Sequence, residues 1–185
     1  MRAEDTSIPG CTLLHLDRHE DERGDFVKAL QRDTYEQLGL DPSVAELFWS
    51  TSRRGVVRGL HFQTPPHAHA KTVTVVRGEV LDVVVDLRVG SPTYRRNCSW
   101  SLSDRAPAAV HIPVGCAHGF AVTSAEAIVL YLVGTEHSPE HDEGIRWDSV
   151  GADWPTTEPL ISARDAGFPA LADFDSPFRF GQQAP

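Results

Sequence analysis

The sequence predicts an all-β fold, an antiparallel β-sandwich or barrel with a few short helices. Short runs rich in β-branched residues recur along the chain, and Gly and Pro residues separate them at the spacing of strands. Helical periodicity is scarce. The length of 185 residues fits one domain, 1–185, with a single core. Together these observations favour packed antiparallel sheets.

The elements can be placed in order along the chain. One short helix is expected near 34–38, because it ends at Gly39 ahead of Asp41-Pro42. The runs 71–76 and 80–87 flank the turn at 77–79 and are expected to pair with each other. In the second run, alternation places four apolar residues on one face: Leu81, Val83, Val85 and Leu87.

Three more strands are expected in the second half of the chain, at 110–113, 119–122 and 127–131. From Ser138 onward the sequence becomes richer in Pro, Asp and Gly. We interpret this part as an extension that packs against the sheets. No internal repeat and no low-complexity linker divides the chain.

Composition excludes several classes of function. The formal net charge of -9 disfavours nonspecific binding to nucleic acid, which depends on Lys and Arg. No run approaches the roughly 18 apolar residues that a membrane helix needs. The N-terminal residues show no apolar leader, and the three Cys residues form no C-x-x-C pair, so we expect a cytoplasmic protein with reduced thiols.

The segment 55–63, GVVRGLHFQ, and the nearby Lys71 are the strongest indication of chemistry. An imidazole can move a proton near neutral pH, and a Lys can hold a developing oxyanion. Strand alternation places Arg58 and Leu60 on one face and His61 on the other, unless a bulge at Gly59 resets the register. A structural His among surface cations is the alternative interpretation.

A second grouping combines His67-Ala68-His69 with 113–118, PVGCAH. The two segments resemble the halves of the cupin signature, in which an H-x-H pair, a Glu and a distant His bind a divalent metal. The Glu is missing, since Val73 and Thr74 stand where it would fall, and the charge of Lys71 would oppose a metal ion. A metal-dependent cupin oxygenase or isomerase that uses His67, His69 and His118 is therefore kept only as an alternative.

Further blocks follow one another in a fixed order: 23–26 (RGDF), 55–63, 70–71 (AK), 77–88 (RGEVLDVVVDLR), 90–93 (GSPT), 112–120 (IPVGCAHGF) and 144–148 (GIRWD). From about residue 13 to residue 175, the chain resembles the dTDP-4-dehydrorhamnose 3,5-epimerase family. The resemblance implies a jelly-roll cupin homodimer that uses no metal and no cofactor. It also implies a nucleotide-sugar substrate, a 4-keto-6-deoxyhexose attached to dTDP.

The resemblance also implies roles for single residues. His61 matches the general base and Asp165 the carboxylate that orients it, while Lys71 matches the cation that stabilises the enolate and Tyr131 the acid. Other positions match residues that contact sugar, phosphate or nucleotide: Arg23, Phe26, Arg58, His118 and Arg164. The N-terminal arm, about 1–30, would contribute to the site of the neighbouring subunit.

Four positions in the substrate-binding part depart from the family pattern. Lys28 stands where a Glu is usual, Glu46 and Phe48 replace a Gln and an Asn, and His137 replaces a second Tyr. The catalytic positions match and the positions that select the sugar do not. Inversion at C3, at C5 or at both therefore stays open, and a noncatalytic sugar-binding cupin is a further alternative.

Overall fold

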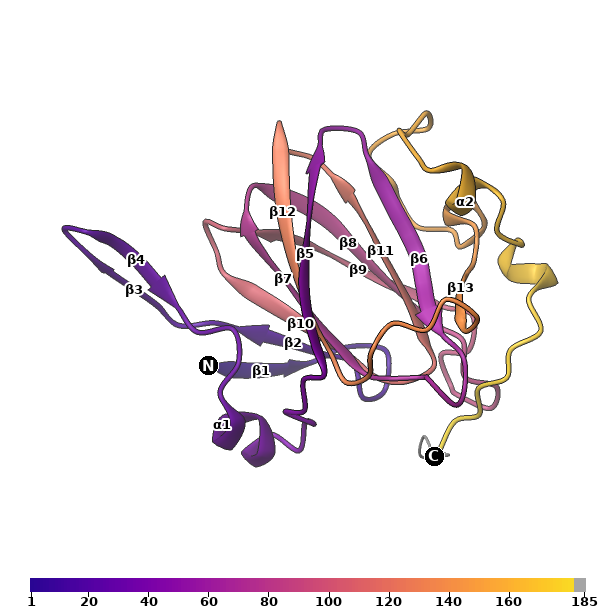
Figure 1. The fold of residues 1–185 in the computed structure, drawn as a ribbon, viewed down its shortest axis with the longest axis horizontal. Coiled ribbons are helices and arrows are strands. Elements are labelled where there is room, and N and C mark those ends of the chain that lie inside the picture. The colour runs from indigo at the N-terminus through magenta and orange to yellow at the C-terminus, as the bar shows by residue number, and fades with distance from the viewer. Residues whose placement is uncertain (182–185) are drawn as a thin grey trace.

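The computed structural model describes residues 1–181 and shows two antiparallel sheets that face one another (Figure 1). The larger sheet has six strands in the order β1 (Arg2–Asp5), β2 (Thr12–His15), β10 (Ala108–Ile112), β7 (Lys71–Arg77), β12 (Glu126–Val133) and β5 (Glu46–Arg53). The smaller sheet has five, in the order β13 (Asp142–Gly144), β6 (Val57–Gln63), β11 (Cys116–Val122), β8 (Glu79–Asp86) and β9 (Asn97–Ser103). The all-β prediction is confirmed.

A separate hairpin and a few short helices complete the fold. Strands β3 (Arg18–Asp21) and β4 (Gly24–Val27) pair only with each other and project from the body (Figure 1). The expected N-terminal helix is α1 (Arg32–Gln37), and the C-terminal part contains η1 (Trp147–Ser149), α2 (Ala163–Ala166) and η2 (Leu171–Asp173). Within residues 1–181, every helix is too short to cross a bilayer.

Apolar side chains fill the space between the two sheets and also cover the outer face of the smaller one. Strand β8 shows both layers, because Val84 packs between the sheets while Val83 and Val85 point outward. The outward face carries Leu81, Val83, Val85 and Leu87, as the alternation predicts. Residues of the C-terminal extension cover it, among them Ile145, Val150, Leu171, Phe174 and Phe178.

The predicted pairing of 71–76 with 80–87 is wrong. Strand β7 pairs with β10 and β12, and β8 pairs with β11 and β9, so the two strands belong to different sheets. Gly78, with a φ of +81°, carries the chain from one sheet to the other. Each strand is interior to its sheet and has both hydrogen-bonding edges occupied, which leaves no edge for a hairpin.

Candidate active site

A cavity of about 440 Å³ opens between the two sheets, and both sheets line it. Most of the predicted site residues come together in its lining: Glu46, Phe48, Arg58, His61, Lys71, His118, Tyr131, His137 and Arg164. The larger sheet contributes Lys71 from β7 and Tyr131 from β12, whereas the smaller sheet contributes His61 from β6. The groups for proton transfer thus face one cavity from opposite walls.

A bulge in β6 brings Arg58 and His61 to the same cavity. In the pairing with β11, His118 lies opposite His61, but Phe120 lies opposite Arg58, so β6 has one extra residue there. Leu60 turns to the outer apolar layer instead. The register reset that the sequence left open therefore occurs, and simple alternation does not describe this strand.

Gly59 allows this bulge because the backbone of β11 passes very close to it. Its φ is +120°, and a Cβ there would lie 2.6 Å from the Gly119 Cα. We expect Gly59→Ala to lower the free energy of unfolding by roughly 2–6 kcal/mol, through backbone strain and overlap together. Gly55→Ala is the matched control, since Gly55 has a φ of +79° with open space around it and should lose only about 1–2 kcal/mol. Equal losses in urea titrations would contradict this account.

His61 is paired with Asp165, which α2 places behind it. His61 Nε2 lies 3.0 Å from Asp165 Oδ1, and the Gly59 N–H donates to the other carboxylate oxygen at 3.0 Å. Burial by itself would raise the pKa of Asp165, but the hydrogen bond and charge of His61, together with the Gly59 N–H, hold that pKa below its ordinary value. An ionised Asp165 therefore fixes the orientation of the imidazole ring.

Lys71 and Tyr131 are both partly buried in the wall of the cavity. Lys71 Nζ donates to the His61 carbonyl oxygen at 3.1 Å, and burial lowers the pKa of Lys71 to about 8. Burial likewise raises the pKa of Tyr131, an effect that the Ser50 hydroxyl opposes in part. At neutral pH the cavity thus holds a charged ammonium and a neutral phenol, which can stabilise an oxyanion and supply a proton, respectively.

His118 is held by a carboxylate that sequence reasoning missed. Its Nε2 lies 2.8 Å from Asp82 Oδ2, and both side chains are buried. Asp82 stands inside the apolar run of β8, so it resembled a core position. The pairing orients the His118 ring toward the Tyr131 ring, whose centroid is 6.2 Å away.

The three histidines of the metal alternative do not converge. His69 and His118 line the cavity, but His67 does not and packs on the His141 ring at 4.6 Å. His69 Nδ1 contacts the Thr135 hydroxyl at 2.7 Å, and burial, with the charge of Lys71, lowers the pKa of His69 to about 4. Residues 1–181 contain no cluster of three or more potential metal ligands.

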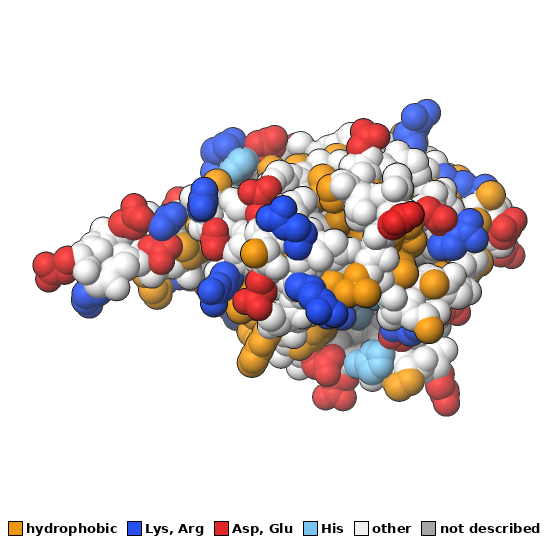
Figure 2. Space-filling view, turned by 90° about the horizontal axis from the view of Figure 1, so that it is seen from above, with side chains coloured by type: hydrophobic (Ala, Val, Ile, Leu, Met, Phe, Trp, Pro, Cys, Tyr) orange, Lys and Arg blue, Asp and Glu red, His pale blue; other side chains and the backbone are white. Residues whose placement is uncertain are grey.

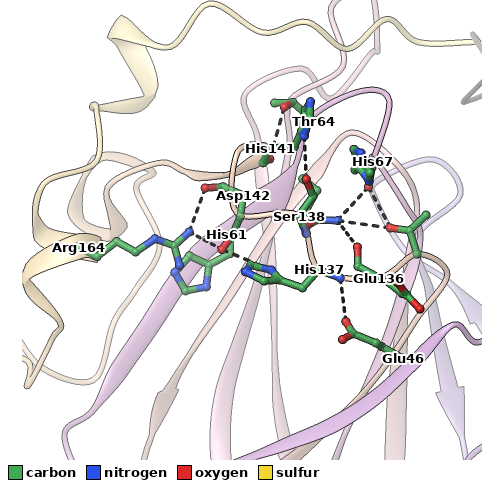
Figure 3. A network of polar contacts seen from close by, with 12 residues as sticks. Glu46, His61, Thr64, His67, Glu136, His137, Ser138, His141, Asp142 and Arg164 are labelled. Atoms are coloured by element: carbon green, nitrogen blue, oxygen red, sulfur yellow. Dashed lines mark hydrogen bonds and ion pairs between the residues drawn. The ribbon is translucent and has the colours of Figure 1, made fainter.

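Several residues of the cavity lining belong to one polar network (Figure 3). Glu46 accepts a hydrogen bond from the His137 backbone N–H at 3.0 Å, and Arg164 forms an ion pair with Asp142 at 2.7 Å. The Gln63 side chain holds the segment around His137 by accepting from the Ser138 N–H at 2.6 Å and donating to the Glu136 carbonyl at 3.3 Å. Asp142 and the anchoring role of Gln63 were not predicted, because their partners, Arg164 for Asp142 and residues 136 and 138 for Gln63, are distant in sequence.

Arg23, Phe26 and Lys28 lie away from this cavity, on or next to the β3–β4 hairpin. Phe26 is 57% exposed, and Lys28 Nζ lies 5.9 Å from its ring centroid. Figure 2 shows the hairpin extending from one end of the molecule with acidic and basic side chains along it. Within this chain, these three residues cannot contact a molecule bound beside His61.

Comparison with known proteins identifies the family of this chain. The profile of the family dTDP-4-dehydrorhamnose 3,5-epimerase matches residues 5–173. A dTDP-4-dehydrorhamnose 3-epimerase of Streptomyces niveus is 40% identical over 94% of this chain and 85% of that protein.

Two solved structures share the fold over most of their length. NovW, a 4-keto-6-deoxy sugar epimerase from the novobiocin biosynthetic gene cluster of Streptomyces spheroides, superposes with a TM-score of 0.89 at 40% identity, covering 93% of this chain and 88% of that one. The RmlC epimerase of Legionella pneumophila in complex with dTDP-4-keto-L-rhamnose gives 0.89 at 34% identity, covering 94% of each chain. The chain therefore belongs to the dTDP-4-dehydrorhamnose 3,5-epimerase family, whose members are isomerases that act on sugars.

Proposed function

We propose that this protein is a nucleotide-sugar epimerase that inverts C3, C5 or both in a dTDP-linked 4-keto-6-deoxyhexose. The observation that carries the proposal is the placement of the His61–Asp165 pair on one wall of the cavity, with Lys71 and Tyr131 on the other. Relatives named as epimerases of such sugars, and a relative structure with dTDP-4-keto-L-rhamnose bound, support it.

Each group has one step in the proposed mechanism. The 4-keto group acidifies the neighbouring C–H bonds, so His61 removes a proton and the electron pair moves to the keto oxygen. Lys71 holds the resulting enolate, and Tyr131 returns a proton from the opposite face. Arg58, His118 and Arg164 line the same cavity and would bind the sugar and its phosphates. Proton removal and return leave the oxidation state unchanged.

Solvent exchange tests this function directly. In D₂O, dTDP-4-keto-6-deoxyglucose should gain deuterium at C3, at C5 or at both, and the label at each carbon is measured by NMR. If neither C3 nor C5 gains label, the proposed substrate is wrong. Loss of exchange after chelator treatment, with recovery on adding iron, nickel or zinc, would instead favour the metal-dependent alternative.

We also propose that the protein works as a cytoplasmic homodimer in which the arm of residues 1–30 completes the partner's site. The support is the exposed position of Arg23 and Phe26, far from the cavity of their own chain. We expect an arm variant, Arg23→Glu with Phe26→Ala, and a His61→Ala variant each to have low epimerase activity when assayed alone. Mixed dimers should regain activity at one of their two sites, because that site has an intact His61 and an intact arm. If mixing restores nothing while mixed dimers form, the arm does not act across the interface.

A further inference from the structure

We propose that Phe48 is a positioning residue for Tyr131, and that it restricts proton return to one of the two carbons beside the keto group. This inference rests on the proposed epimerase function and concerns the specificity of the same site. It gives a role to the apolar residue that stands where the family pattern has an Asn.

The two rings are in face-to-face contact across neighbouring strands. Phe48 on β5 is the register partner of Tyr131 on β12, and their ring centroids lie 4.7 Å apart with an angle of 14° between the planes. The His118 ring meets Tyr131 edge-on, at 6.2 Å and 72°, and is itself held by Asp82. Two aromatic rings therefore contact the phenol ring, one stacked on it and one edge-on, and leaving this orientation would break the stack.

Ring packing is the contact that fixes the plane of the phenol ring. The Ser50 hydroxyl lies in the same cavity wall and acts on the Tyr131 hydroxyl, but a contact at that single atom does not set the plane of the ring. A tyrosine ring can rotate about its side-chain torsions unless neighbouring groups confine it. Phe48 supplies that confinement on the side of β5.

A confined acid has a chemical consequence in this site. C3 and C5 lie on opposite sides of C4, and Lys71 would hold the oxygen on C4 during the reaction. Inversion at both carbons requires the acid or the sugar to move between two protonation events. A Tyr131 ring held by its contacts with Phe48 and His118 delivers a proton readily to one of these carbons and poorly to the other. We therefore expect inversion predominantly at a single carbon.

The test compares deuterium uptake at C3 and at C5 in the same reaction, together with KM. Wild-type protein should label one carbon much faster than the other. Phe48→Leu removes the flat ring and should reduce that preference by about 2- to 12-fold, the range corresponding to one aromatic pair. Phe48→Trp keeps a flat ring and should retain the preference. Trp49→Leu is the matched control, because Trp49 is 65% exposed and lies outside the cavity lining.

The outcomes separate this inference from the proposed function. Label at neither carbon in wild-type protein would refute the function itself. Equal rates of label at both carbons would leave the function standing and refute the role of Phe48. If folded Phe48→Leu changes KM but keeps the wild-type preference, Phe48 only fits the sugar and does not position Tyr131.

Discussion

Replacement of His61 by alanine is expected to reduce solvent exchange at the substrate carbons by about 10²- to 10⁴-fold, the usual contribution of a general base. The loss should be this large because His61 lines the cavity and its ring is held in place by the buried carboxylate of Asp165, so it is the proposed base. NMR in D₂O under saturating substrate measures it, and circular dichroism confirms the fold.

His67→Ala is the matched control for that experiment. His67 is a neighbouring histidine that packs on His141 outside the cavity, so its loss should leave exchange near the wild-type rate. A folded His61→Ala protein that still exchanged at the wild-type rate would remove His61 from the role of base. Equal damage from both substitutions would favour a role for histidines in metal binding.

Replacement of Lys71 by methionine is expected to reduce the exchange rate by about 10²- to 10³-fold, as for removal of a group that stabilises an oxyanion. The wild-type rate should also fall as pH rises through about 8. Burial lowers the pKa of Lys71 to about that value, so the ammonium is charged below it and neutral above it. The enolate then loses its cation, whereas the raised pKa of Tyr131 keeps the acid protonated over this range.

Lys71→Arg separates the charge from its titration. The guanidinium stays charged at all accessible pH values, so this variant should lose the decline above pH 8 and remain more active than Lys71→Met. Rate profiles from pH 6 to pH 9.5 measure the difference. A decline near pH 8 that persists in Lys71→Arg would assign that titration to another group.

Local patterns predicted the class of fold and most of the strands, but not every pairing. The short α1 helix ends just ahead of Gly39, as that glycine indicated, and the outward face of β8 follows the strand period. The expected hairpin of β7 and β8 failed because a Gly turn between two apolar strands reads the same whether the chain pairs back or crosses to a second sheet. The other strands decide between these outcomes: β7 pairs with β10 and β12, and β8 pairs with β9 and β11.

Site residues whose type alone indicates their chemistry could be predicted. Residues whose role depends on the side chains around them in the fold were missed. His61, Lys71 and Tyr131 could be named from the sequence and its resemblance, and the structure brings them to one cavity. Asp82 could not, because a carboxylate within an apolar strand carries no sign of the buried His118 that it meets. The shared face of Arg58 and His61 likewise depended on a bulge that alternation cannot place.

Because the site is divided between the two sheets, the distance between the sheets sets the distance between the groups that would remove and return the proton. His61, the proposed base, stands on the smaller sheet and Tyr131, the proposed acid, on the larger one, and packed sheets lie roughly 10 Å apart. Apolar residues between the sheets, such as Val73, Val84 and Val110, set this spacing although they lie outside the cavity lining. A core that is packed differently would shift Tyr131 relative to His61. We therefore expect substitutions between the sheets to change the catalytic rate as well as the stability.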